Sequence, residues 1–330
     1  MKNALIIGVT GQDGAYLSDF LLKKGYSVFG TFRRTSHKCF ERIEEMNNYD
    51  KIIRIKADLA DYSSLQAAIR QAQPDEVYNL ASQSFVGVSF QQPILTADIT
   101  GLGTLRVLDA VKENMPNAKF YQASSSEMYG NYTGVKNEDS YFKPRSPYGA
   151  AKVFAHHITN YYREAYDISA SCGILFNHES PLRGIEFVTR RITWNLARIK
   201  LNQIKKFTLG NIHARRDWGF AGDYVEAMWM MLQQNKPDDY VIATGESHSV
   251  EEFLTLATEY AGLGDWRDII EIDKSIMRPT DIDDLVGDSS KARKQLGWKP
   301  KMNFKDLVKT MVEHDIDYFK SGMDQFHLHT

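Results

Sequence analysis

An apolar strand followed at once by a glycine-rich turn stands at the start of this 330-residue chain. Ala4–Ile7 leads into Gly8-Val9-Thr10-Gly11-Gln12-Asp13-Gly14, and apolar residues at helical spacing follow. In this strand–turn–helix context, glycines let the backbone approach a pyrophosphate, and the helix N-terminus supplies free amides. We therefore expect a dinucleotide to contact Gly8, Thr10, Gly11, Gln12, Asp13 and Gly14; a plain tight turn is the alternative.

The end of the next expected strand bears on the choice between NAD and NADP. An NAD site has an acidic residue there, which bonds the ribose 2′-hydroxyl. This chain instead has Thr31-Phe32-Arg33-Arg34-Thr35-Ser36. Two guanidiniums and two hydroxyls suit a 2′-phosphate. Arg33, Arg34, Thr35 and Ser36 thus predict NADP as the cofactor, the alternative being a solvated basic loop.

Strands and helices alternate through the first half of the chain. Apolar runs predict strands at 4–7, 26–31, 51–55, 76–80, 118–122 and 168–174, with helices at 16–22, around 65–69 and at 102–111. This alternation is typical of an α/β fold with a Rossmann-type doubly wound parallel sheet. Later helices are expected at 186–203, 222–235, 249–262 and 304–319. We expect a Rossmann domain over 1–176, with a returning part near 220–245, and a smaller mixed α/β substrate-binding domain over 177–330.

Two loops follow expected strands on the side where a parallel sheet binds ligands, which is at the carboxyl ends of its strands. The candidate cofactor contacts there are Asp58 and Leu59 after the third strand, and Leu80, Ala81, Ser82, Gln83 and Ser84 after the fourth. Taken alone, each segment is equally well an ordinary loop.

Two later segments carry candidate catalytic groups. Tyr148 and Lys152 lie four residues apart at the start of an expected helix, so they share one helix face. A nearby ammonium is expected to lower the tyrosine pKa and make the phenol an acid or base near neutral pH. Ser125, at the end of the fifth expected strand, offers a hydroxyl to a reacting oxygen.

Together these motifs resemble the extended short-chain dehydrogenase/reductase superfamily and, within it, the GDP-mannose 4,6-dehydratases. The segments that carry the resemblance are 8–17, 123–130, 145–149, 176–181, 216–219 and 297–300, and the likeness runs from residue 3 to about 315. The resemblance implies a lyase of deoxysugar biosynthesis that removes water from a GDP-sugar and recycles NADP. The two sparse cysteines and the short apolar run at 4–7 favour a cytoplasmic location.

The resemblance also implies a role for each catalytic residue. Tyr148 takes the proton of the sugar 4-hydroxyl while hydride leaves C4, and Ser125 bonds the reacting oxygen. Glu127 then removes the C5 proton and protonates the departing 6-hydroxyl, which suits a carboxylate that is base and then acid within one turnover. A capping or ion-pairing role is the alternative for Glu127, because charged groups at strand ends are usually solvated or paired.

Further binding residues are implied by the resemblance alone. Leu95, His178 and Arg183 match cofactor contacts, beside Tyr148 and Lys152. Candidate substrate contacts are Ser84, Glu127, Asn177, Arg183, Arg216 and Arg278, with the three arginines expected in loops near the diphosphate. For each arginine alone, a surface ion pair is the alternative.

Two departures from the family pattern leave the substrate and the assembly open. Ser125 stands where the family commonly has threonine, and the segment from Thr35 to Asp58 is shorter than in the longer dehydratases. A GDP-D-glycero-D-manno-heptose 4,6-dehydratase is therefore an alternative. The helix around 101–111 matches the superfamily's dimer-forming element, so a homo-dimer or homo-tetramer is expected.

Composition, charge and the candidate catalytic residues limit the functional classes to which the chain can belong. A net charge of −2 shows no global electrostatic footprint for nucleic acid or membrane. Cys39 and Cys172 are the only cysteines, and neither they nor the two histidines of the expected solvated tail at 324–330 show metal-ligand spacing. A nucleotide-sugar epimerase or reductase is less favoured because of Glu127. A non-catalytic NADP-sensing protein would have little reason to retain the four catalytic residues.

Overall fold

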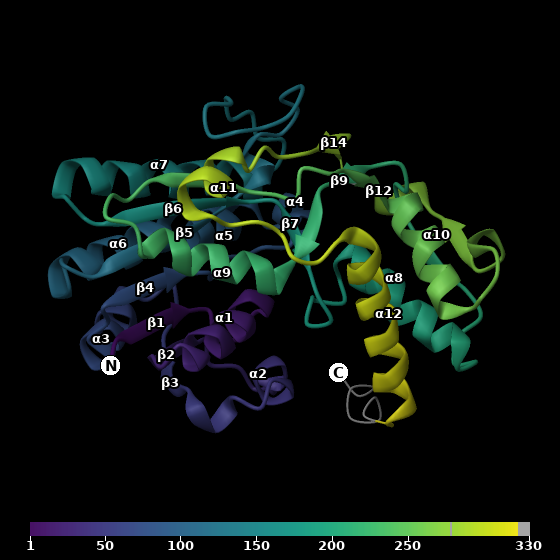
Figure 1. Ribbon diagram of the computed structural model, residues 1–330, viewed down its shortest axis with the longest axis horizontal. Coiled ribbons are helices and arrows are strands. Elements are labelled where there is room, and N and C mark those ends of the chain that lie inside the picture. Colours follow the sequence, from purple (N-terminus) through teal and green to yellow (C-terminus); the bar gives the residue numbers. More distant parts are fainter. Residues whose placement is uncertain (278, 323–330) are drawn as a thin grey trace.

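A seven-stranded sheet forms the centre of the molecule, in the strand order β11-β6-β5-β4-β1-β2-β3. The computed structural model describes residues 1–277 and 279–322. The strands are β1 (Asn3–Ile7), β2 (Ser27–Phe32), β3 (Ile53–Lys56), β4 (Glu76–Asn79), β5 (Lys119–Ser125), β6 (Ala170–Leu175) and β11 (Asp239–Ile242). Every neighbouring pair is parallel. This confirms the expected doubly wound α/β fold (Figure 1).

Helices cover both faces of the sheet, because alternate side chains of a buried strand point in opposite directions. Leu5 and Ile7 join the apolar cluster of α3 (Tyr62–Ala72) and α6 (Gly103–Asn114). Ala4 and Ile6 join the cluster of α1 (Gln12–Lys23) and α9 (Ala221–Leu232). Near-continuous apolar strands are thus explained by burial on both faces.

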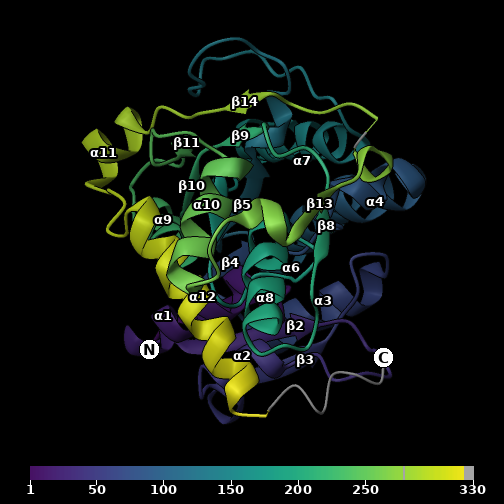
Figure 2. The same cartoon turned by 90° about the vertical axis from the view of Figure 1, so that its right-hand side faces the viewer.

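The second lobe is built around three helices, α8 (Val188–Lys200), α10 (Val250–Ala261) and α12 (Phe304–Lys320), which share one apolar cluster (Figure 2). Their bounds lie within three residues of the expected helices. Short strands complete the lobe: β7 (Asn177–Glu179), β8 (Phe207–Leu209), β9 (Arg215–Arg216), β10 (Trp218–Phe220), β12 (His248–Ser249), β13 (Ile270–Ile272) and β14 (Asp284–Leu285). These were not expected, because two or three residues show no periodicity.

The chain returns to the large sheet after the first part of the second lobe. Helix α9 packs against α1, and β11 pairs with β6 from Asp239 to Ile242. Shorter helices join the main elements: α2 (Glu41–Glu45), α4 (Val86–Gln91), α5 (Pro93–Thr96) and α11 (Ser290–Leu296). A π-helix at Ala97–Leu102 precedes α6. Helix α6 itself begins at Gly103, close to the expected start at residue 102. The tail at 324–330 lies outside the described residues. Over the described part of the chain, every helix is too short or too polar to cross a bilayer.

Candidate active site

A cavity of about 390 Å³ lies at the carboxyl ends of the central strands and is closed on its other side by the second lobe. This is where open parallel sheets bind ligands. Its wall contains the glycine loop, the ends of β5 and β6, and the start of the long helix α7 (Pro147–Tyr166). The second lobe contributes residues between Leu209 and Asp281.

The glycine loop is shaped by two different requirements. Gly8 has a φ of +91°, and a Cβ there would lie 2.9 Å from the Ala81 side chain; at Gly14 a Cβ would lie 2.5 Å from the Val9 carbonyl oxygen. The fold itself therefore excludes side chains at both positions. A Cβ at Gly11 would make only an ordinary contact, 3.6 Å from the Gly8 oxygen. Gly11 is also the N-cap of α1 and lines the cavity, so its missing side chain leaves room for a phosphate beside the helix N-terminus.

Gln12 and Asp13 connect this loop to β7. The Gln12 amide donates to the His178 carbonyl (3.1 Å) and accepts from the Ser180 hydroxyl (2.8 Å). Asp13 Oδ2 lies 2.8 Å from His178 Nε2. Burial opposes ionisation of Asp13, yet the His178 cation lowers its pKa to about 2, and the pKa of His178 is correspondingly raised.

The expected catalytic strand end is formed as predicted. Strand β5 ends at Ser125, whose hydroxyl accepts a hydrogen bond from the Glu127 amide (3.2 Å) and so starts a short 3₁₀ turn at Ser126–Met128. This turn directs Glu127 to the cavity, where it is 8% exposed. A carboxylate thus faces the same space as the Ser125 hydroxyl.

Helix α7 begins where its sequence allows a helix to begin. The Ser146 hydroxyl accepts from the Gly149 amide (3.0 Å), and Pro147 occupies the first turn, where a missing amide proton costs nothing. Tyr148 is consequently in the first turn, and both it and Lys152 are buried at the cavity. The Tyr148 hydroxyl shares a hydrogen bond with Ser125.

The expected effect of Lys152 on the Tyr148 pKa is wrong. Burial raises the pKa of Tyr148 to about 12, although its hydrogen bond with Ser125 acts in the opposite direction. The Lys152 Nζ lies 5.7 Å from the Tyr148 ring centre and donates instead to the Ala123 carbonyl oxygen (2.7 Å). Burial lowers the pKa of Lys152 itself to about 8. The Lys152 side chain therefore bonds the backbone of β5, and burial is the main influence on the pKa of Tyr148.

Residues 80–84 divide between the cavity and the wall behind it. Leu80, Ser82 and Ser84 line the cavity. Ala81 packs behind Gly8, and the Gln83 side chain donates to a backbone carbonyl at residue 85. The cofactor contact implied for Leu95 is not formed by this cavity, because that side chain lies on α5 and the residue is 47% exposed.

The other expected cofactor residues lie outside the cavity wall. Arg33, Arg34, Thr35 and Ser36 form an exposed stretch directly after β2. Thr10 is half-buried, and its carbonyl accepts from Arg42. Asp58 accepts from the Ala60 amide, and Leu59 is buried against Gly103.

The two described arginines of the expected substrate site both line the cavity, as does Asn177. Arg183 Nε lies 3.1 Å from a Glu179 oxygen, and its guanidinium stacks 3.6 Å from the Phe187 ring centre. Arg216 does not lie in a loop as expected, because it forms strand β9. Arg278 lies outside the described residues.

Arg216 is held firmly by the protein. It donates to the Ile282 carbonyl (2.6 Å) and to the Asp281 carboxylate (3.1 Å), and it is 7% exposed. Arg216 thus forms an ion pair, which was the alternative to substrate binding, and it also lines the cavity. Asp281 also lines the cavity, so the Arg216 guanidinium is held in a fixed direction beside a carboxylate.

Several cavity residues were not expected from the sequence. They include Phe85, Phe187, Asn211 and Ile276, none of which lies in a motif. Glu179, Trp218 and Asp281 also line the cavity. Glu179 and Trp218 lie in segments that carried the family resemblance, and Asp281 follows soon after Arg278 in the sequence, although none of the three was named as a site residue.

The chain is similar to known proteins over nearly its whole length. The family model described as GDP-mannose 4,6 dehydratase matches residues 5–311. GDP-mannose 4,6 dehydratase 1 of Arabidopsis thaliana is 54% identical, over 97% of this chain and 91% of that protein. The human GDP-mannose 4,6 dehydratase is 46% identical, over 97% and 92%.

The fold also has solved counterparts outside this family. The UDP-glucose 4-epimerase of Thermotoga maritima, solved with UDP-glucose, superimposes with a TM-score of 0.85 at 23% identity, over 97% of this chain and 99% of that one. Since the likeness at this identity concerns the fold, the assignment rests on the sequence relatives and the family model. Their identity over nearly the whole length shows that this chain belongs to the GDP-mannose 4,6-dehydratase family.

Proposed function

We propose that this chain is an NADP-dependent lyase that converts GDP-mannose to GDP-4-keto-6-deoxymannose. The observation that carries the proposal is the meeting of Ser125, Glu127, Tyr148 and Lys152 in one cavity beside the glycine loop. An epimerase or reductase has no need of a carboxylate that exchanges protons at C5 and C6, whereas dehydration does.

The chain's own residues account for each proton movement. Tyr148 takes the proton of the sugar 4-hydroxyl, and the Ser125 hydroxyl, already bonded to the phenol, aligns that oxygen. Once C4 is a ketone, the C5 proton is acidic and Glu127 removes it. Glu127 then protonates the 6-hydroxyl, which leaves as water; the hydride removed from C4 would be returned by the cofactor to C6, and the proton taken by Tyr148 would go to C5. The net change is the loss of one water.

The cofactor assignment is supported by how well the loop fits a dinucleotide. Gly11 leaves open space at the N-terminus of α1, and Lys152 is directed to the β5 backbone next to the reacting groups. When bound, the oxidised nicotinamide supplies a hydride acceptor and a positive charge that favours the Tyr148 phenolate. NADP rather than NAD is supported by the exposed Arg33 and Arg34 after β2, where an NAD site would have an acid.

Self-association is supported by exposed apolar side chains around the π-helix. Ile94 is 85% exposed on α5, Leu102 is 45% exposed at the end of the π-helix, and Phe154 and Tyr161 are exposed on the neighbouring helix α7. The π-helix and α7 pack together, since a Cβ at Gly101 would meet Phe154 at 3.3 Å. A second copy of this chain is the proposed partner of this face.

The deciding experiment incubates the purified protein with GDP-mannose and, separately, with GDP-D-glycero-D-manno-heptose, and analyses the products by mass spectrometry. Loss of one water from GDP-mannose, without net consumption of added NADP, is the expected result. Turnover of the heptose alone would move the substrate assignment to the alternative. No product from either nucleotide sugar would contradict the proposed function.

The role of Glu127 has its own test. Glu127→Gln is expected to lower water loss by about 10²- to 10⁴-fold, because the amide cannot exchange the proton. Transient NADPH formation, followed by absorbance in a stopped-flow instrument, should persist. Exposed Glu44 serves as the matched control, and Glu44→Gln is expected to behave as wild type. Normal dehydration by Glu127→Gln would show that this carboxylate has another role.

A further inference from the structure

Ser124 stands between the two residues of β5 that the catalytic pair of α7 already holds. Lys152 bonds the carbonyl of the preceding residue, and Tyr148 bonds the hydroxyl of the following one. The Ser124 hydroxyl lies 3.1 Å from Nδ1 of His156. Three successive residues of the strand end are thus each bound by side chains of α7 spaced four apart, which share one helix face.

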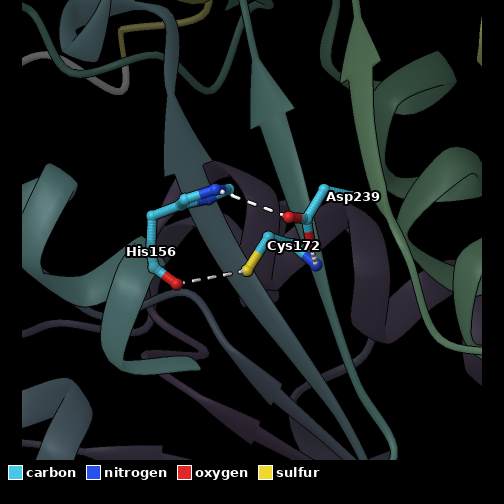
Figure 3. Close-up of side chains that lie close together, drawn as sticks. All are labelled: His156, Cys172 and Asp239. Carbon is cyan, nitrogen blue, oxygen red and sulfur yellow. Dashed lines mark hydrogen bonds and ion pairs between the residues drawn. The ribbon is translucent and has the colours of Figure 1, made fainter. Parts of the chain in front are cut away.

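The opposite side of the His156 ring faces β11, as Figure 3 shows. Nε2 of His156 lies 3.5 Å from an oxygen of Asp239, the first residue of β11. His156 is 4% exposed, and burial lowers its pKa to about 4, so the ring is neutral at physiological pH. Nε2 also lies 3.3 Å from the side-chain amide of Asn160, which donates to Asp239, so the imidazole connects β5 with the Asn160–Asp239 pair beside β11.

Asp239 is itself fixed by three further groups. Its carboxylate accepts from the Arg163 guanidinium (2.9 Å), from the Asn160 amide (2.9 Å) and from the Cys172 backbone amide (3.3 Å). Arg163 and Asn160 continue the same face of α7 towards its C-terminus. A buried carboxylate with these partners has little freedom to move, so it is a firm support for the imidazole.

The group formed by His156, Cys172 and Asp239 has the residue types of a metal site, with one ligand atom of each within 4.8 Å of the others. The contacts of these three residues argue against a metal. The carboxylate already neutralises Arg163, and a cation at that point would compete with the guanidinium. Burial raises the pKa of the Cys172 thiol, which disfavours the thiolate that a metal requires. The cluster is accounted for by hydrogen bonding.

We propose that His156 is a positioning residue which, anchored by Asp239, fixes Ser124 and so aligns the catalytic end of β5 with the cavity face of α7. The inference rests on the proposed function, because the residues that His156 would align are the ones that transfer protons in the proposed reaction. His156 is separated from the cavity by Ser124, so its effect is expected on the chemical step and not on substrate affinity.

Two substitutions of His156 separate positioning from bulk. His156→Leu fills a similar volume without polar atoms, whereas the Asn side chain of His156→Asn places a hydrogen-bonding group near the former Nδ1. His156→Leu should lower kcat by about 10- to 100-fold, the cost of a misplacement of about 1 Å, with KM little changed. His156→Asn should restore most of kcat. Thr159→Val, at a buried position of the same helix whose hydroxyl donates to the Ala155 carbonyl and not to β5, is the matched control and should keep kcat.

A measurement that needs no substrate makes the inference independent of the proposed activity. Hydrogen exchange of the backbone amides at 123–127, read by mass spectrometry, should be at least about tenfold faster in His156→Leu than in Thr159→Val. Lack of wild-type turnover would overturn the proposed function alone, and the exchange comparison would still decide the positioning. Equal exchange in the two variants, or a kcat loss that His156→Asn fails to restore, would overturn the inference.

Discussion

The imidazole of His178 and the carboxylate of Asp13 form an ion pair of 2.8 Å that joins the glycine loop to strand β7. The pair places a negative charge inside a loop shaped for phosphate. The His178 cation compensates that charge, and its ring also stacks on Tyr224 at 4.6 Å, which holds it in place. The two side chains are only 22% and 11% exposed, so their interaction is weakly screened by solvent.

This pair should make stability depend on pH in a defined direction. The raised pKa of His178 gives stabilisation that is complete below about pH 6.5, its unfolded pKa, and is lost as pH rises through the folded value. The lowered pKa of Asp13 gives stabilisation that is present above its ordinary 3.8 and is lost as pH falls through about 2. The pair therefore contributes most between about pH 4 and 6.5.

His178→Asn should consequently cost about 3 kcal/mol of unfolding free energy near pH 6, because it leaves a buried carboxylate unpaired. The difference from wild type should shrink as pH rises above 6.5. Chemical denaturation followed at several pH values measures both. His213, whose side chain is 80% exposed, provides the control variant His213→Asn. A pH-independent difference would show that the pair is not ionised as described.

Lys152→Met should separate catalysis from stability. Loss of the ammonium is expected to lower kcat by about 10²-fold, because the end of β5 loses its bond to α7. The free energy of unfolding should change by less than about 1 kcal/mol, since the lost hydrogen bond is offset by the relief of burying a charge. Steady-state kinetics and thermal unfolding test the two halves. Lys305→Met, at an exposed position of α12, is the control. A large fall in the free energy of unfolding would contradict the expected small effect on stability.

Cofactor preference should depend on the two arginines after β2. Replacing both Arg33 and Arg34 by alanine is expected to weaken NADP binding by about 10- to 100-fold and to leave NAD binding nearly unchanged, because the proposed partner of both guanidiniums is the 2′-phosphate, which NAD lacks. Calorimetric titration with each dinucleotide measures this. Lys38→Ala, in the same exposed segment, should alter neither affinity. Equal weakening of both cofactors would locate the arginines elsewhere in the site.

The apolar face around the π-helix should mediate self-association. Ile94→Lys places a charge on a residue that is 85% exposed in the single chain and would be buried against a second copy. The mass in solution, measured by light scattering after size exclusion, should fall to that of one chain or of a smaller assembly. Ile272→Lys, on the second lobe and 45% exposed, controls for the added charge. An unchanged mass in Ile94→Lys would place the interface on another surface.

Local sequence features predicted the fold and the local placement of the candidate catalytic residues, for identifiable reasons. Gly8 and Gly14 are required by backbone contacts close to them in the fold. Ser146 and Pro147 mark the start of α7, so Tyr148 and Lys152 are placed in register by helix geometry alone. Strand β5 was expected at 118–122 but continues to Ser125, because its last residues are small and polar and carry no apolar signal.

The tertiary structure decided what lies opposite these residues and how each is charged. Lys152 was expected to act on Tyr148, but it donates to Ala123 because β5 passes directly under α7. Arg216 became a strand residue bonded to Asp281, across a distance of 65 residues in the chain.

The sequence by itself thus determined the main strands and helices, the glycine loop and the chemical groups of this protein, because glycine sterics, helix spacing and apolar periodicity act over a few residues. The pairing of Asp13 with His178, the support of His156 by Asp239 and the raised pKa of Tyr148 were decided only by the tertiary structure. Hydrogen-bond partners and desolvation depend on which distant segments are brought together, and that information is absent from any short stretch of chain.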